Sequence, residues 1–170
     1  MARCIIAGVI VTYLLAVLQT TLGGVFAIRG VSPDLLLIWT ICLGLLSGRT
    51  PGALIGFACG LLEGGLTQAW IGAFAISKAL TGFGAGVLAT KLFRENWAVP
   101  SVSAAVLTLF NDVTFLLVSR ADSWPHAVHV IAMRMAYHAV LAPVLFVLTI
   151  RVRRVLLGRR EWSEALPADR

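Results

Sequence analysis

Residues 51–66 read PGALIGFACGLLEGGL, and this apolar stretch decides the fold. Its one charged side chain is Glu63, and four of its glycines recur at four-residue spacing: Gly52, Gly56, Gly60 and Gly64. On an α-helix this spacing places all four on one face, where a neighbouring helix can approach closely. Helices in lipid associate through such contact, because lipid tails are as apolar as leucine. The stretch therefore predicts a tightly packed helix in a membrane bundle.

The whole chain has the composition of a membrane protein. Of its 170 residues, 59% are hydrophobic and 13% are charged, and the mean hydropathy is +0.91. A helix needs about 20 residues to cross a hydrocarbon core about 30 Å thick, so six spans would use about 120 residues. A soluble catalytic or nucleotide-binding domain needs more than about 100, and no polar block here approaches that size. Function is therefore expected in or at the bilayer.

We predict an all-α bundle of about six transmembrane helices over residues 1–150. The predicted spans are residues 4–27, 34–47, 51–66, 70–92, 98–118 and 126–150, followed by a basic cytoplasmic tail at residues 151–170. The first apolar run is longer than a signal peptide requires, so we interpret it as a retained span. The second and third spans are shorter than about 20 residues, which leaves a re-entrant hairpin or a five-span chain as alternatives.

The distribution of basic residues predicts the orientation. With the N-terminus inside, the outer loops contain two basic residues, Arg29 and Arg120. The inner side contains nine: Arg3, Arg49, Lys91, Arg94, Arg151, Arg153, Arg154, Arg159 and Arg160. Basic residues accumulate in cytoplasmic loops, which also accounts for the net charge of +6 without a nucleic-acid partner. Both termini are therefore predicted to be cytoplasmic.

A second small-residue face occurs in residues 70–92, where Gly82 and Gly86 follow Lys78 at four-residue spacing. Together with the glycines of residues 51–66, these positions predict either packing within the bundle or a groove for another protein's transmembrane helix. In the tail, residues 151–160 interleave apolar and basic residues. The basic residues are expected to contact anionic headgroups or an acidic partner: Arg151, Arg153, Arg154, Arg159 and Arg160.

Four ionisable residues fall inside the predicted spans: Glu63, Lys78, Asp112 and Arg134. A lone charge at mid-membrane costs about 2.5 to 3.5 kcal/mol even on lenient scales, so such residues usually pair. At 1.5 Å per residue, all four lie about 6 to 12 Å below the outer surface. We therefore expect Glu63 to pair with Lys78, and Asp112 with Arg134, with Asn111 and His138 nearby. The pairs could fix helix register, line a polar cavity, form a proton path or recognise a partner.

No catalytic constellation emerges, so we expect a protein that is not an enzyme and that has no cofactor or metal ion. His126 and His129 lack a carboxylate or cysteine at helical spacing, which makes a metal site improbable. Ser77 and Lys78 are adjacent, and adjacent helical side chains point about 100° apart, so they do not form a catalytic dyad.

Three motifs make the chain resemble the MreD family of bacterial rod-shape-determining membrane proteins. They are SPDLLL at residues 32–37, which contains Pro33, Asp34 and Leu35, GFACGLLE at residues 56–63, and GAFAISKALTGF at residues 72–83. Length, span number and the basic C-terminal end also agree, so the likeness covers about residues 1–157. Glu63 stands where family members more often have aspartate.

The resemblance implies a non-catalytic subunit of the cell-wall elongation complex in the bacterial inner membrane. Such subunits bind the bitopic protein MreC and, through it, the actin-like MreB filament and a glycosyltransferase and transpeptidase pair. The family fold is similar to the six-helix substrate-binding subunits of energy-coupling-factor vitamin transporters. That similarity implies the alternative function, a substrate-binding transport subunit whose outer-half charges line a ligand cavity.

Overall fold

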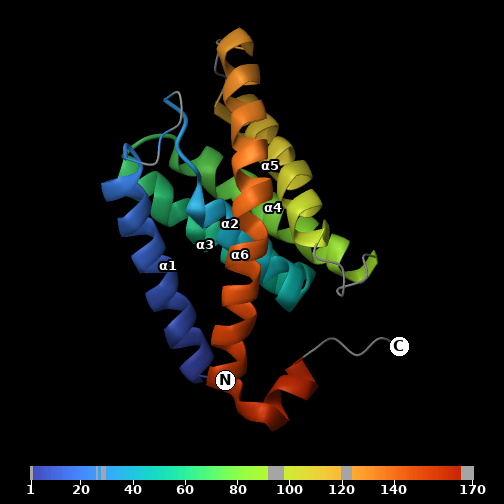
Figure 1. Cartoon of the computed structure of the whole chain (residues 1–170). Coiled ribbons are helices and arrows are strands. Elements are labelled where there is room, and N and C mark those ends of the chain that lie inside the picture. Colours follow the sequence, from blue (N-terminus) through green and yellow to red (C-terminus); the bar gives the residue numbers. More distant parts are fainter. Residues whose placement is uncertain (1, 26, 28–29, 92–97, 120–123, 166–170) are drawn as a thin grey trace.

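The computed structural model describes residues 2–25, 27, 30–91, 98–119 and 124–165, and these residues form an all-helical protein. The helices are α1 (Ala2–Leu22), α2 (Leu35–Ser47), α3 (Arg49–Thr67), α4 (Ile71–Lys91), α5 (Ala98–Ser119) and α6 (Trp124–Ala165) (Figure 1). The predicted all-α class is confirmed.

Three described helices contain segments long and apolar enough to cross a membrane: Ile71–Ala89, Val99–Ser119 and Ala127–Arg154. Large apolar side chains also cover the outside of the molecule; Val9, Leu54 and Val140 are 63%, 66% and 73% exposed. An apolar exterior of this extent marks a surface that meets lipid. The chain is therefore a membrane protein.

Helix α2 forms the centre of the bundle. Every residue from 36 to 42 is buried, as expected for a helix that is apolar on all sides. Its side chains pack on one side against Ala85 of α4 and Leu107 of α5, and on another against Ala104 of α5 and Ala142 of α6. Because its 13 residues extend only about 20 Å, α2 is shorter than the hydrocarbon core.

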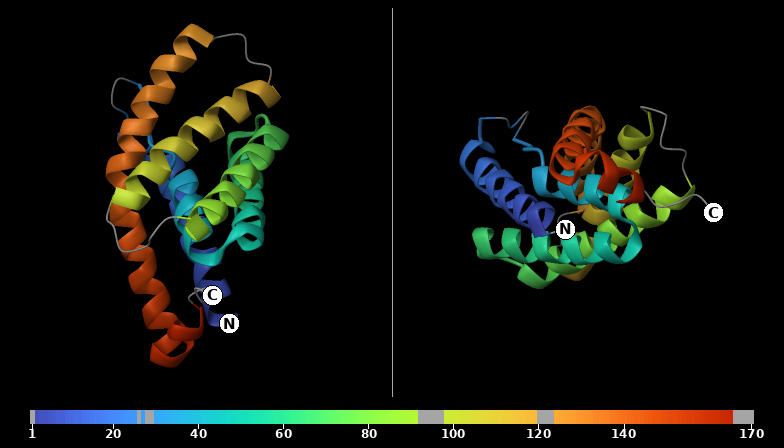
Figure 2. Two further views of the ribbon diagram at one scale, coloured as in Figure 1. Left: turned by 90° about the vertical axis from the view of Figure 1, so that its right-hand side faces the viewer. Right: turned by 90° about the horizontal axis from the view of Figure 1, so that it is seen from below.

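Helices α3 and α4 form a hairpin whose contact consists of the two glycine faces (Figure 2). A Cβ atom on Gly56 would lie 2.1 Å from the Lys78 carbonyl oxygen, and one on Gly60 would lie 2.3 Å from that of Phe74. Conversely, a Cβ on Gly82 of α4 would lie 2.0 Å from the carbonyl oxygen of Gly52 on α3. The structure thus uses these faces for packing inside the bundle rather than as a groove for another chain.

Two helix ends differ from the predicted spans. Helix α1 stops at Leu22, before Gly23 and Gly24, because glycine is unfavourable in a helix. Helix α6 passes residue 150 without a break and continues to Ala165, since good helix formers follow. The start of α1 and the end of α6 lie at the same end of the molecule, the lower end in Figure 1.

Candidate functional site

Asp34, the first residue of the predicted span 34–47, lies inside the bundle rather than at its surface. The residue is 2% exposed and is the N-cap of α2, where its Oδ1 accepts a hydrogen bond from the Leu37 amide at 2.8 Å. Its own amide donates to Nε2 of His138 on α6 at 3.0 Å. This position has a physical cause: the short helix α2 begins within the bundle, so the chain before it must enter with its polar groups satisfied.

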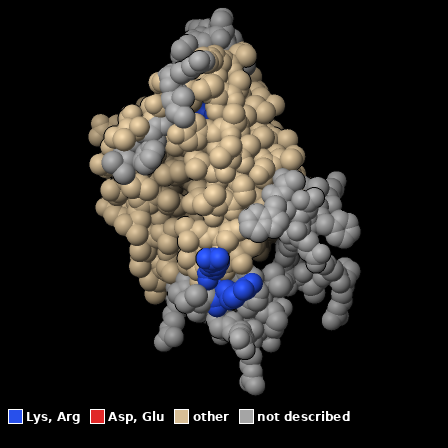
Figure 3. Space-filling view, in the orientation of Figure 1, with Lys and Arg blue, Asp and Glu red and all other residues tan. Residues whose placement is uncertain are grey.

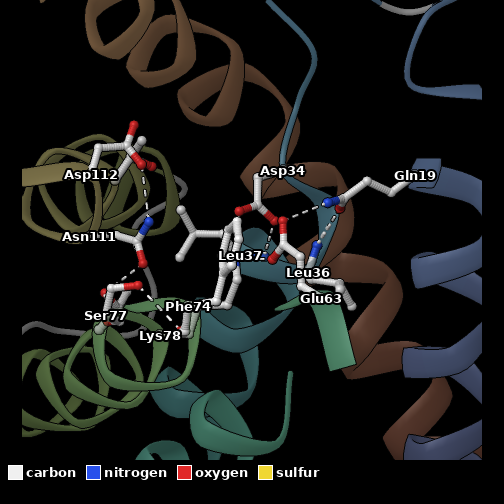
Figure 4. A network of polar contacts seen from close by, with 12 residues as sticks. Gln19, Asp34, Leu36, Leu37, Glu63, Phe74, Ser77, Lys78, Asn111 and Asp112 are labelled. Atoms are coloured by element: carbon white, nitrogen blue, oxygen red, sulfur yellow. Dashed lines mark hydrogen bonds and ion pairs between the residues drawn. The ribbon is translucent and has the colours of Figure 1, made fainter. Parts of the chain in front are cut away.

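Lys78 of α4 joins Asp34 to Glu63 of α3 (Figure 4). Its Nζ forms an ion pair with Asp34 Oδ2 and lies 2.8 Å from Glu63 Oε2. The lysine is 1% exposed and Glu63 is 6% exposed. One ammonium group therefore bridges two carboxylates in a site closed to the outside.

Gln19 connects α1 to this group of charges. Its Nε2 donates to Glu63 Oε1 at 3.1 Å, and its Oε1 accepts from the Leu36 amide at 3.1 Å. One glutamine thus satisfies both the carboxylate on α3 and a free amide in the first turn of α2. The first turn of a helix always leaves such amides without partners in the helix itself.

The second ion pair joins α5 to α6. Arg134 Nη1 lies 3.3 Å from Asp112 Oδ1, and Asn111 Nδ2 donates to the same oxygen at 3.0 Å. His138, one turn from Arg134, pairs through Nδ1 with the Thr108 hydroxyl at 2.7 Å. Asp112 Oδ2 and Arg134 Nε have no hydrogen-bond partner within the described part of the chain. We use the name charge cluster for Asp34, Glu63, Lys78, Asp112 and Arg134.

The structure thus brings together the two pairs expected from depth, Glu63 with Lys78 and Asp112 with Arg134. It adds a fifth charge, Asp34, that sequence reasoning had left out of the pairing. With Asp34 included, three carboxylates face two cations, whereas the four residues of the two expected pairs would together be neutral. If every group is ionised, the charge cluster carries one excess negative charge, which one proton would balance.

The other predicted site residues lie elsewhere. Pro33 is buried and leads into α2, whereas Leu35 is half-buried in its first turn. Arg151 and Arg154 are exposed near the end of the apolar part of α6, and Arg153 is half-buried there. The side chains of Arg159 and Arg160 lie outside the described residues.

The sequence did not lead us to predict the hydrogen bonds of Gln19 or the one between the Asp34 amide and the His138 imidazole. A signal for Gln19 was present, because it is a polar side chain well inside an apolar segment and needs a buried partner. For Asp34, the Pro-Asp sequence before an apolar run is typical of an N-cap. The sequence did not reveal that this cap lies inside the bundle.

The arrangement holds charge and fixes helices relative to one another. Among the described residues no group of three His, Cys, Asp or Glu side chains could hold a metal ion. The Ser77 hydroxyl donates to the Phe74 carbonyl at 3.3 Å, whereas Lys78 turns to Asp34 and Glu63, so the two neighbours contact different groups.

No protein-family model, curated protein or solved structure matches the chain.

Proposed function

We propose that this chain is an MreD-like, non-catalytic scaffold subunit of the bacterial cell-wall elongation complex. In this proposal it spans the inner membrane six times with both termini in the cytoplasm. It binds an MreC-like bitopic protein and, through that protein, links an actin-like MreB filament to the wall glycosyltransferase and transpeptidase.

The observation that carries the proposal is that the three motifs of the resemblance converge on one contact. Asp34 comes from residues 32–37, Glu63 from residues 56–63 and Lys78 from residues 72–83, and Lys78 pairs with both carboxylates. In addition, Gly56 and Gly60 pack against the backbone of Lys78 and Phe74. The residues behind the resemblance therefore act as one structural unit, which is what a shared fold requires.

The closure of this unit favours a scaffold over a transport subunit. Lys78 is 1% exposed, and its ammonium group is occupied by two carboxylates. A ligand cavity would need some of these polar groups to point into open space. Charges that pair with one another between helices instead fix the arrangement of α2, α3 and α4. This arrangement determines the surface that a partner would contact.

The test is depletion of the chain in its source bacterium, with lateral-wall synthesis followed by incorporation of a fluorescent D-amino acid. We expect rods to become round and lateral labelling to be lost. An affinity-tagged copy should restore shape and co-purify a single-span protein together with the wall synthases. Rods that persist with unchanged lateral labelling would contradict the proposal.

The transport alternative is separated by a binding assay. The purified chain in detergent is heated with riboflavin, thiamine, biotin or folate, which represent the substrates of such transporters. The scaffold proposal expects the melting temperature to be unchanged by each vitamin. A rise that saturates with vitamin concentration would favour the transport subunit.

A further inference from the structure

An apolar groove of about 520 Å³ lies between α1 and the bundle formed by α2, α3 and α6. Gly8 and Thr12 of α1 line one wall, Trp39 of α2 and Ala58 of α3 line the opposite one, and Thr149 and Arg153 of α6 line the rest. None of the residues of the charge cluster lines this groove. It is therefore separate from the candidate site described above.

The groove exists because α1 contacts the bundle at few points. Ala16 is 1% exposed, and the Trp39 indole nitrogen donates to the Thr12 hydroxyl at 3.0 Å. One turn earlier stands Gly8, where an added Cβ would meet nothing within 4 Å. The space beside Gly8 is thus left open by the lack of a side chain rather than filled by a neighbour.

The lining favours an apolar occupant. The Trp39 indole and the hydroxyls of Thr12 and Thr149 already have partners within the chain. Trp39 donates to Thr12, Thr12 donates to the Gly8 carbonyl at 2.8 Å, and Thr149 donates to the Leu145 carbonyl at 2.6 Å. A polar ligand would lose its hydrogen bonds to water there and find few replacements.

The size of the groove excludes a transmembrane helix. A helix about 10 Å wide with a pitch of 5.4 Å fills roughly 420 Å³ per turn. A span has about five turns and would need roughly 2100 Å³, which exceeds the total empty space of about 1350 Å³ in the groove. A flexible hydrocarbon chain is much thinner and can follow the groove between the helices.

Charge at one end of the groove identifies the headgroup. Arg153 lines the groove, and Arg151 and Arg154 are exposed on the same part of α6. Figure 3 shows blue side chains gathered at the lower end of the described surface. Arginine binds phosphate oxygens through charge-assisted hydrogen bonds. We propose that the groove binds one acyl chain of an anionic phospholipid whose headgroup contacts the arginines of α6.

Fluorescence quenching of Trp39 tests this proposal, because Trp39 lines the groove yet is only 5% exposed. The chain carries Trp70→Phe, Trp97→Phe, Trp124→Phe and Trp162→Phe, so that Trp39 alone emits. It is placed in phosphatidylcholine nanodiscs containing the same small fraction of dibrominated phosphatidylglycerol or dibrominated phosphatidylcholine. We expect the brominated phosphatidylglycerol to quench at about fivefold lower content, which corresponds to about 1 kcal/mol for a basic residue at the surface.

Two matched variants decide the site. Gly8→Phe fills the groove and should abolish the quenching of Trp39, whereas Gly72→Phe, at an exposed glycine outside the groove whose Cβ also meets nothing within 4 Å, should leave it unchanged. Arg153→Gln should reduce the preference for phosphatidylglycerol while a chain still enters. Equal quenching by the two lipids, or quenching that survives Gly8→Phe, would overturn the proposal.

Discussion

At the residue scale, Lys78 decides whether the centre of the molecule is stable. Its ammonium group faces Asp34 and Glu63 in a site that is nearly closed to solvent. A buried charge that loses its partner costs far more than an exposed one, because neither water nor a counter-ion replaces the contact. The fold therefore depends more on the cation, Lys78, than on either one of the two carboxylates that contact it.

We predict that Lys78→Met lowers the free energy of unfolding by about 3 to 5 kcal/mol, because two carboxylates then share one buried site without a cation. Glu63→Gln is the matched control. It keeps an oxygen for Lys78 and removes the excess negative charge, but its amide nitrogen faces Gln19 Nε2, so it should lower that free energy by only about 1 to 2 kcal/mol. Unfolding by sodium dodecyl sulfate in mixed micelles measures both. Equal losses for the two variants would contradict the central role of Lys78.

A charge exchange tests the pair between α5 and α6. Asp112→Arg and Arg134→Asp each place two like charges where the wild-type atoms are 3.3 Å apart, and each should reduce the folded protein in membranes severely. The double exchange restores opposite charges and should recover most of it, as judged by gel-filtration monodispersity in detergent. Failure of the double variant to exceed either single variant would mean that the pairing is not what these residues contribute.

The residue scale also shows where sequence reasoning stops. Counting residues from the ends of helices gave the depth of Lys78 and Asp112, because helical rise is regular. No such count applies to Asp34, since residues 30–33 before α2 are not helical. Loops carry no periodic signal. The structure was therefore needed to show that Asp34 belongs to the charge cluster and that the cluster has one excess negative charge.

At the element scale, the fold depends on the α3–α4 hairpin. Spacing predicted both glycine faces, because a four-residue repeat has one geometric meaning on a helix. It left open whether the faces meet each other or another chain, since either partner would select the same small residues. The structure shows the two faces in contact with each other. Substitutions in them should therefore change the stability of the fold, whether or not they affect a partner.

We predict that Gly60→Ala destabilises the chain by about 1 to 3 kcal/mol or more, because its Cβ would lie 2.3 Å from a backbone oxygen that cannot move freely. Gly65→Ala on the same helix is the matched control: it is exposed, and its Cβ meets nothing within 4 Å. Alanine favours a helix over glycine, so this control should be neutral or slightly stabilising. Thermal unfolding in detergent should separate the two variants, and similar melting temperatures would contradict the α3–α4 contact.

At the scale of the whole molecule, the remaining question is how the bundle lies in the bilayer. In the described part of the chain, three helices have the length and apolarity of spans, whereas α2 is too short to cross alone. A short central helix is acceptable where protein surrounds it, because its terminal polar groups are satisfied by the neighbouring helices. The six-span orientation therefore depends on the α3–α4 turn reaching the outer surface and on the basic end of α6 staying inside.

Cysteine labelling in intact cells tests that orientation. Ala69→Cys lies in the exposed turn between α3 and α4, and Arg154→Cys replaces an exposed residue of α6. In a Cys4→Ser background the other two cysteines, Cys42 and Cys59, are buried. We expect a membrane-impermeant maleimide to label Ala69→Cys in intact cells and Arg154→Cys only after permeabilisation. Labelling of both before permeabilisation would place the two positions on one side, which six spans with cytoplasmic termini forbid.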